Sequence, residues 1–216
     1  HYICTHMHPC LIELHYFPPI QYMSKFLMHE PVVIEAHENY QKGSYRNRMK
    51  IIGANGPEML SIPLRSGKHQ QKPVREVEIA YDEPWDVIHW RAIKTAYGSA
   101  PYYEHYADQL ESLIVSKPGY LFDLNLQILD WLLSAIGLKS YELTDRFEKV
   151  PVDKLDLRNT LRPKSPPDDN NFRAVEYFQV FDDRHAFEPN LSILDLLFAL
   201  GPATKTHLRQ CLVLGC

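Results

Sequence analysis

Two short apolar runs and one helical repeat organise the first part of the chain. Residues 11–15 and 31–36 are mostly apolar runs of the length typical of buried strands. Between them, apolar side chains recur at helical spacing over residues 20–27, directly after Pro18 and Pro19. Proline is favourable in a first helical turn because its missing amide hydrogen would have no partner there. The pattern predicts a strand, a helix and a second strand in a βαβ-like unit.

Further strands are predicted from alternating patterns. Residues 50–54 and 59–64 flank an Asn-Gly pair at residues 55–56, which readily takes the positive φ angles of a tight hairpin turn. Residues 74–80 alternate apolar and charged side chains, which indicates a half-exposed strand. Residues 174–181 return to strand character, and we expect them to pair into the same sheet.

Three helices are predicted in the middle of the chain. An acidic pair followed by proline at residues 82–84 is typical of a helix start, and apolar side chains then recur at helical spacing over residues 85–97. A second helix is expected to begin near Pro101. A third, over residues 123–136, ends at Gly137, where a left-handed cap is needed.

The order of these elements predicts an α/β protein with a mixed sheet, surrounding helices and one domain. Residues 151–171 are the least ordered stretch by composition, and we interpret them as a surface loop or a lid. A final helical region is expected to begin at Ser192.

Composition and charge restrict the class of protein. The chain has 216 residues, of which 45% are apolar and 23% charged, as in a soluble protein with one core. The net charge of −4 argues against a general nucleic-acid coat or a membrane-surface binder. No apolar run reaches the roughly 18 to 20 residues of a membrane span, and the pattern of a signal peptide is missing. We therefore expect a cytoplasmic protein.

The cysteines predict neither a disulfide framework nor a metal site. All four lie in the terminal segments, at Cys4, Cys10, Cys211 and Cys216, without paired metal-binding spacing. The histidines within residues 1–10 could join Cys4 and Cys10 in binding a metal, but we assign no metal there.

The stretch from residue 40 to residue 50 concentrates positive charge and tyrosine without any acid. Guanidinium groups bind phosphate or carboxylate with paired hydrogen bonds, and tyrosine rings stack on sugars or bases. The stretch therefore predicts an anion site, with an exposed basic loop as the alternative. A second alternative is a structural ion pair of the arginines with Glu35 or Glu38.

Other substrate-binding candidates come from the predicted cleft and the last helix start. If the first two strands are parallel, the loop after the first strand faces a cleft at the strand ends. A helix start near residue 190 would add free amides that hold an anion. The candidate substrate-binding residues are Tyr40, Lys42, Tyr45, Arg46, Asn47, Arg48, His15, Gln21 and Asn190.

Three residues are candidates for catalysis. His89 lies on or beside the apolar face of its predicted helix, where a neutral imidazole could take a proton, although a core role is the alternative. Glu35, at the end of the second predicted strand, is an alternative base. Asp195 follows Ser192 by three residues, so that a helix-capping pair competes with a catalytic role.

Several enzyme classes lose their main sequence support. The chain has no Gly-rich loop ending in Gly-Lys-Ser/Thr and no Gly-x-Gly-x-x-Gly fingerprint, which disfavours a Walker ATPase and a standard dinucleotide dehydrogenase. It also has no Gly-x-Ser-x-Gly elbow and no His-Glu-x-x-His pair, which disfavours a serine hydrolase and a zinc peptidase.

A family resemblance agrees with the basic stretch. The segments His-Tyr-Phe-Pro-Pro-Ile-Gln-Tyr from His15, Tyr-Arg-Asn-Arg at 45–48 and Asn-Leu-Ser-Ile-Leu-Asp at 190–195 resemble the WbqC-like family. The resemblance covers residues 11–208. It leaves residues 1–10 as an extension and the last residues, 209–216, as a tail.

The resemblance implies a role in surface polysaccharide (O-antigen) pathways, for which glycine or aminoacyl transfer to a sugar has been proposed. Our first hypothesis is therefore a transferase that moves an acyl or aminoacyl group onto an amino sugar or sugar nucleotide. The alternatives are a non-catalytic module that binds an anionic glycan precursor or nucleic acid, and a nucleotide-binding adenylating enzyme. The expected partners are a sugar nucleotide or an acyl donor, with nucleic acid disfavoured by the net charge. No cofactor is assigned.

Overall fold

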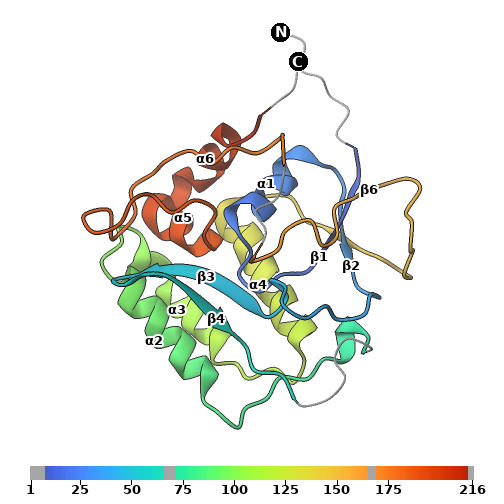
Figure 1. Ribbon diagram of the computed structural model, residues 1–216, viewed down its shortest axis with the longest axis horizontal. Helices are drawn as coiled ribbons and strands as arrows, with labels where there is room; N and C mark the ends of the chain where they lie inside the picture. The colour runs from blue at the N-terminus through green and yellow to red at the C-terminus, as the bar shows by residue number, and fades with distance from the viewer. Residues whose placement is uncertain (1–7, 66–71, 165–168, 214–216) are drawn as a thin grey trace.

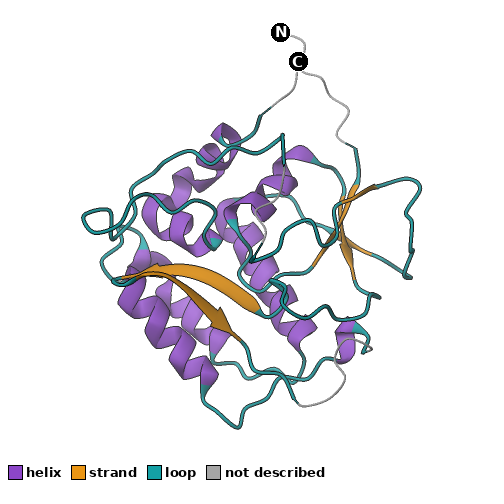
Figure 2. Ribbon diagram, in the orientation of Figure 1, coloured by secondary structure: helices purple, strands orange, loops and turns teal. Residues whose placement is uncertain are grey.

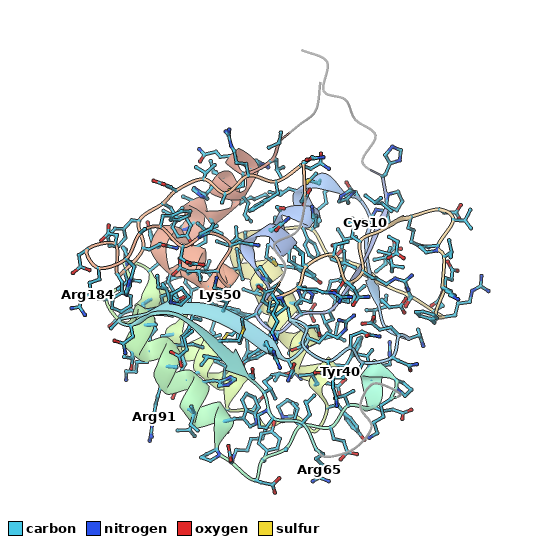
Figure 3. All side chains as sticks on the ribbon, in the orientation of Figure 1. Cys10, Tyr40, Lys50, Arg65, Arg91 and Arg184 are labelled. Carbon is cyan, nitrogen blue, oxygen red and sulfur yellow. The ribbon has the colours of Figure 1, made fainter. Side chains whose placement is uncertain are left out.

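The chain forms two sheets with helices packed around them (Figures 1 and 2). The computed structural model describes residues 8–65, 72–164 and 169–213. One sheet is parallel and has four strands, and the other is a two-stranded hairpin. The chain is therefore an α/β protein with one domain, as the order of apolar patterns predicts.

The parallel sheet brings together strands from distant parts of the chain. Its strands are β1 (Cys10–Glu13), β2 (Val32–Glu35), β5 (Glu142–Leu143) and β6 (Leu155–Asp156). Their order is β5-β2-β1-β6, and every neighbouring pair is parallel. Counted along the chain, the strands of this sheet stand in the order 3-2-1-4, so the order reverses between β1 and β6. In open α/β sheets, the carboxyl ends of the strands at such a switch point form the crevice that binds ligands.

The βαβ-like start of the chain is confirmed. Helix α1 (Ile20–Met28) connects β1 to β2, and Ile12 of β1 lies opposite Ile34 of β2. The helix begins after Pro19, which has extended backbone angles. Its side chains are buried from Ile20 to Phe26, so α1 is an internal layer of the fold.

The predicted hairpin also forms. Strands β3 (Arg48–Gly53) and β4 (Gly56–Ser61) are antiparallel, with Gly53 opposite Gly56 across the turn. Gly56 has a φ of 103°, which side chains other than glycine rarely adopt. The hairpin lies between α2 and α5 in Figure 1, apart from the parallel sheet.

Helices account for most of the remaining core. They are α2 (Trp85–Tyr97), α3 (Tyr103–Ile114), α4 (Leu121–Ile136), α5 (Ile193–Leu200) and α6 (Thr204–Gln210), with short 3-10 turns at Val74–Glu76 and Gly201–Ala203. Gly137 ends α4 in the left-handed conformation, as predicted. The start of α2 is also predicted correctly, but neither acid before it caps the helix, because Pro84 occupies the cap position.

Two strand predictions are wrong. Residues 74–80 form the 3-10 turn Val74–Glu76 followed by isolated bridges, in which Ile79 pairs with Leu64 and Glu78 with Tyr120. Residues 174–181 are irregular and do not join the parallel sheet. In residues 74–80 the alternation reflects Val74, Val77 and Ile79, which are buried in the core without forming a continuous strand.

The two faces of the parallel sheet are covered differently. Ile12 and Ile34 point to the face that belongs to the main core. Leu11 and Val33 point to the opposite face and border a cavity of about 300 Å³. Residues 144–154, which we call the crossover segment, connect β5 to β6 over this opposite face without forming a helix or strand. In Figure 1 the segment is part of the wide loop beside β6.

Candidate functional site

Buried polar side chains gather where the parallel strands end. Glu13 and Glu35 are the last residues of β1 and β2, and Arg158 and Asn159 follow β6. Both carboxylates are almost completely buried. We call the group formed by Glu13, His15, Glu38, Arg46 and Asn159 the switch-point cluster, because it lies where the strand order reverses.

Glu13 is the centre of this cluster. Its Oε1 lies 3.1 Å from Nε2 of His15 and 3.9 Å from Nη1 of Arg46. Its Oε2 accepts a hydrogen bond from the backbone amide of Asn159 at 3.0 Å. Burial alone would raise the pKa of Glu13, but His15 and Arg46 outweigh that effect and lower the pKa from 4.5 to about 2. Glu13 is therefore an ionised acceptor at neutral pH.

His15 is held as a neutral imidazole. Burial lowers its pKa below 6.5, although Glu13 acts in the opposite direction. The rings of Tyr22 and Tyr45 lie 4.5 and 5.5 Å from the imidazole, measured between centroids. When Nε2 carries the proton, it donates a hydrogen bond to Glu13. Nδ1 then has a lone pair without a hydrogen-bond partner in the described structure. Such an imidazole can accept a proton.

Arg46 also approaches Glu13 and is fully buried. Its Nε and Nη2 donate to the two oxygens of Glu38 at 2.8 and 2.7 Å, and Nη2 also donates to Oδ1 of Asn159 at 3.0 Å. The side chain of Asn125 in α4 holds the Arg46 carbonyl oxygen at 2.7 Å. The structure thus shows the ion pair between Arg46 and Glu38 that the sequence indicates as an alternative to an anion site. Only Nη1 has no hydrogen-bond partner in the described part of the chain.

The rest of the basic stretch does not form one hollow with Arg46. Tyr40 donates to Asn47 at 2.9 Å, and Asn47 donates to the Ile62 carbonyl oxygen at 2.9 Å, which fastens the stretch to the end of the hairpin. Lys42 is exposed, and Arg48 is half-buried as the first residue of β3. Arg46 precedes that strand.

Glu35 is fully engaged by structural partners. Its Oε2 accepts from Nη1 of Arg158 at 2.9 Å, and its Oε1 accepts from the Thr144 hydroxyl at 3.0 Å and the His37 amide at 2.8 Å. These bonds fasten the segments after β5 and β6 to the end of β2. The geometry supports an anchoring role for Glu35.

His89 lies apart from the switch-point cluster. Its Nδ1 is 2.9 Å from the hydroxyl of Tyr16, and its ring meets Trp85 edge-on at 5.1 Å. Burial lowers the pKa of His89 from 6.5 to about 4. No hydrogen bond joins it to His15 or Arg46 in the described residues. The buried imidazole bonded to Tyr16 fits the alternative role of His89 as a core residue.

Gln21 and Asn190 bind each other instead of facing a cleft. The backbone amide of Gln21 donates to Oδ1 of Asn190 at 2.9 Å, and Nδ2 of Asn190 donates back to Oε1 of the Gln21 side chain at 3.0 Å. At the start of α5, Ser192 accepts from the Leu194 amide, and the Ile193 amide donates to the Pro18 carbonyl oxygen. The Ile193 and Leu194 amides are therefore already used at this helix start, whereas free amides at Asn190 and Leu191 stay a prediction.

Asp195 is buried in a polar group with Tyr177 and Gln179. It accepts hydrogen bonds from the Tyr177 hydroxyl and from Nε2 of Gln179. Burial raises its pKa from 3.8 to about 6, although these bonds act in the opposite direction. Ser192 caps the helix as predicted, but its own amide donates to the Lys50 carbonyl oxygen and leaves no capping bond for Asp195.

Asp195→Asn is expected to alter how stability depends on pH. Because the folded pKa is raised, the folded chain keeps a proton that the unfolded chain releases, so the wild type loses stability as pH rises from about 4 to about 6. The difference in unfolding free energy between variant and wild type should therefore change by about 3 kcal/mol over this window. Urea unfolding at a series of pH values measures it, and a constant difference would contradict the shift.

Sequence reasoning missed Glu13, Arg158 and Asn159. Glu13 ends an apolar run, and its position at a strand end is the signal that could have identified it. Arg158 and Asn159 follow a strand of only two residues, which has no periodic pattern to place it beside β1.

Comparison with known proteins agrees with the resemblance. Residues 14–159 match the WbqC-like protein family, over more than half of the chain. The chain belongs to this family. The match is shorter than the expected residues 11–208. It includes His15, Arg46 and Asn159, and it excludes Glu13 and Asp195.

A similar protein is known from Mycobacterium tuberculosis (strain ATCC 25618 / H37Rv). Its uncharacterized protein Rv1507c is 25% identical over 221 residues, which cover 91% of this chain and 92% of that protein. No solved structure was found to match the chain. The family relationship therefore identifies relatives without naming a reaction.

Two other features concern membranes and metals. Within residues 8–65, 72–164 and 169–213, no helix has both the length and the apolar character that crossing a bilayer requires. In the same ranges, no three histidine, cysteine or acidic side chains gather in a way that could hold a metal ion. Residues 1–7, which contain Cys4 and two of the histidines considered for a metal, lie outside the described structure, whereas Cys10 is buried in β1.

Proposed function

We propose that this WbqC-like protein transfers an acyl or aminoacyl group to an amine or hydroxyl of a sugar or sugar nucleotide, in cytoplasmic steps of surface polysaccharide synthesis. The observation that supports the proposal is a pair of unsatisfied atoms in the switch-point cluster. Nδ1 of His15 and Nη1 of Arg46 are both buried without a hydrogen-bond partner in the described structure, and both side chains approach the same oxygen of Glu13.

The two atoms offer complementary chemistry. Nδ1 of His15 takes a proton from the acceptor as its nitrogen or oxygen attacks the carbonyl carbon of the donor. Glu13 stabilises the imidazolium that forms. Nη1 of Arg46 donates a hydrogen bond to the carbonyl oxygen as it gains negative charge. When the bond between the carbonyl carbon and the leaving group breaks, His15 returns the proton to the leaving group.

Substrate access requires movement at Tyr45. The side chains of His15 and Arg46 are closed off from solvent, and the Tyr45 ring lies beside the imidazole. Tyr45 is buried without a hydrogen bond from its hydroxyl to another described residue, so its outward rotation breaks no such bond. In this proposal Tyr45 covers the site in the free protein and contacts the acceptor in the complex.

The test is a transfer assay with purified protein. Nucleotide-linked amino sugars are offered with acyl and aminoacyl thioesters, and mass spectrometry follows addition of the acyl mass to the acceptor. The proposal predicts product with wild type and with His105→Asn, an exposed histidine in α3, but not with His15→Asn. Equal product formation by His15→Asn and wild type would refute the assigned role. Binding without product in every combination would favour the non-catalytic module.

Nucleotide binding with adenylation is a second candidate, favoured by the 3-2-1-4 strand order. It is less well supported, because the Ile20 and Gln21 amides at the start of α1 already donate to Leu191 and Asn190. ATP-dependent stabilisation against heat together with pyrophosphate release would favour this reading.

A further inference from the structure

One face of the parallel sheet lacks a layer of regular structure. Parallel sheets are found almost only where both faces are covered, usually by helices. In this chain, the crossover segment, which contains no helix or strand, lies over the face that carries Leu11 and Val33. A cavity of about 300 Å³ remains between that segment and the sheet. Leu11 and Val33 are nevertheless almost completely buried, so an irregular segment takes the place of a helix on this face.

The crossover segment exposes large apolar side chains instead of burying them. Phe147 is 51% exposed, Val150 77% and Val152 90%. Phe147 is oriented by the guanidinium of Arg158, whose carbon lies 5.1 Å from the ring centroid. Clusters of exposed apolar side chains are typical of interaction sites, whereas single ones need no explanation. The crossover segment thus has the character of a docking surface.

The charges around these side chains indicate which partner fits. Acids and bases of both signs stand in and beside the segment without an ion pair to any described residue: Glu142, Asp145, Lys149, Asp153 and Lys154. A nucleic acid would require a predominantly basic surface, and a strongly charged protein would require one of uniform sign. A surface with both signs can pair with a rotated copy of itself.

We propose that the crossover segment is the interface of a two-fold symmetric dimer of this chain. The apolar side chains of each copy cover the partner's crossover segment, and the unpaired acids of one copy face the lysines of the other. The dimer adds a second layer of protein over the crossover segment. The proposal does not depend on the proposed transfer reaction.

The mass of the full chain in solution tests the proposal. Light scattering during size-exclusion chromatography should give twice the chain mass of 25.2 kDa for wild type. The double variant Val150→Asp, Val152→Asp should give the mass of one chain, because carboxylates at the interface would have to be desolvated without partners. Ile88→Asp, on α2 and 50% exposed, is the matched control and should remain dimeric.

A second measurement separates loss of the interface from loss of folding. Circular dichroism should show unchanged helix content in the double variant, since both valines are exposed in the single chain. Amide hydrogen exchange of residues 144–154 in wild type should slow as protein concentration rises. A monomeric wild type at every concentration, a double variant that stays dimeric, or exchange in the segment that ignores concentration would overturn the proposal.

Discussion

Arg46→Met is expected to lower the free energy of unfolding by about 3–5 kcal/mol, the largest effect on stability that the structure indicates. The substitution keeps most of the side-chain volume but removes the charge that faces Glu38. Two hydrogen bonds to that carboxylate are lost, and Glu38 would remain buried without its counter-ion. Urea unfolding followed by circular dichroism at neutral pH measures the change.

Two further variants test this explanation. Lys42→Met removes a cation from the same stretch at an exposed position, so stability should change by no more than about 0.5 kcal/mol. Glu38→Gln combined with Arg46→Met should recover part of the loss, because residue 38 no longer carries an unpaired charge, whereas Glu13 still lacks the guanidinium. A single Arg46→Met variant as stable as the Lys42→Met variant would show that the ion pair contributes little.

The elements that sequence reasoning predicted well are those with strong local signals. The β1-α1-β2 unit, the hairpin with its Asn-Gly turn and the glycine that ends α4 each depend on a pattern within a few residues. The two short strands β5 and β6 depend on pairing with residues more than a hundred positions away. Two-residue strands have no periodicity, so only the folded chain reveals the 3-2-1-4 order.

The candidate site shows the same division between local and distant information. Local charge density drew attention to the stretch around Arg46, but its counter-ion Glu38 and its neighbour Asn159 determine what Arg46 can do. His15 and its place after the first strand were also predictable from the sequence. The convergence of Glu13, His15 and Arg46 was not, because it requires the hairpin segment and the end of β6 to meet at the end of β1.

His15→Asn is expected to reduce kcat of the proposed transfer by about 10²- to 10⁴-fold, the usual contribution of a general base, with a smaller effect on KM. Asparagine places polar atoms in the same space but cannot take a proton at neutral pH. The wild-type rate should fall only when His15 becomes protonated. Because burial holds the pKa of His15 below 6.5, that fall is expected at a lower pH than for a free imidazole, and His15→Asn should lack it.

Glu13→Gln provides the conservative comparison for this prediction. The amide can still accept the hydrogen bond from Nε2 of His15, but it no longer stabilises an imidazolium, so kcat should fall while substrate binding is retained. His105→Asn should behave as wild type. The decisive result is the pH profile, because a merely structural role of His15 would reduce the amount of folded protein without removing the acidic limb of the rate. If that limb persists unchanged in folded His15→Asn, another group accepts the proton and the Glu13–His15 pair is not the base.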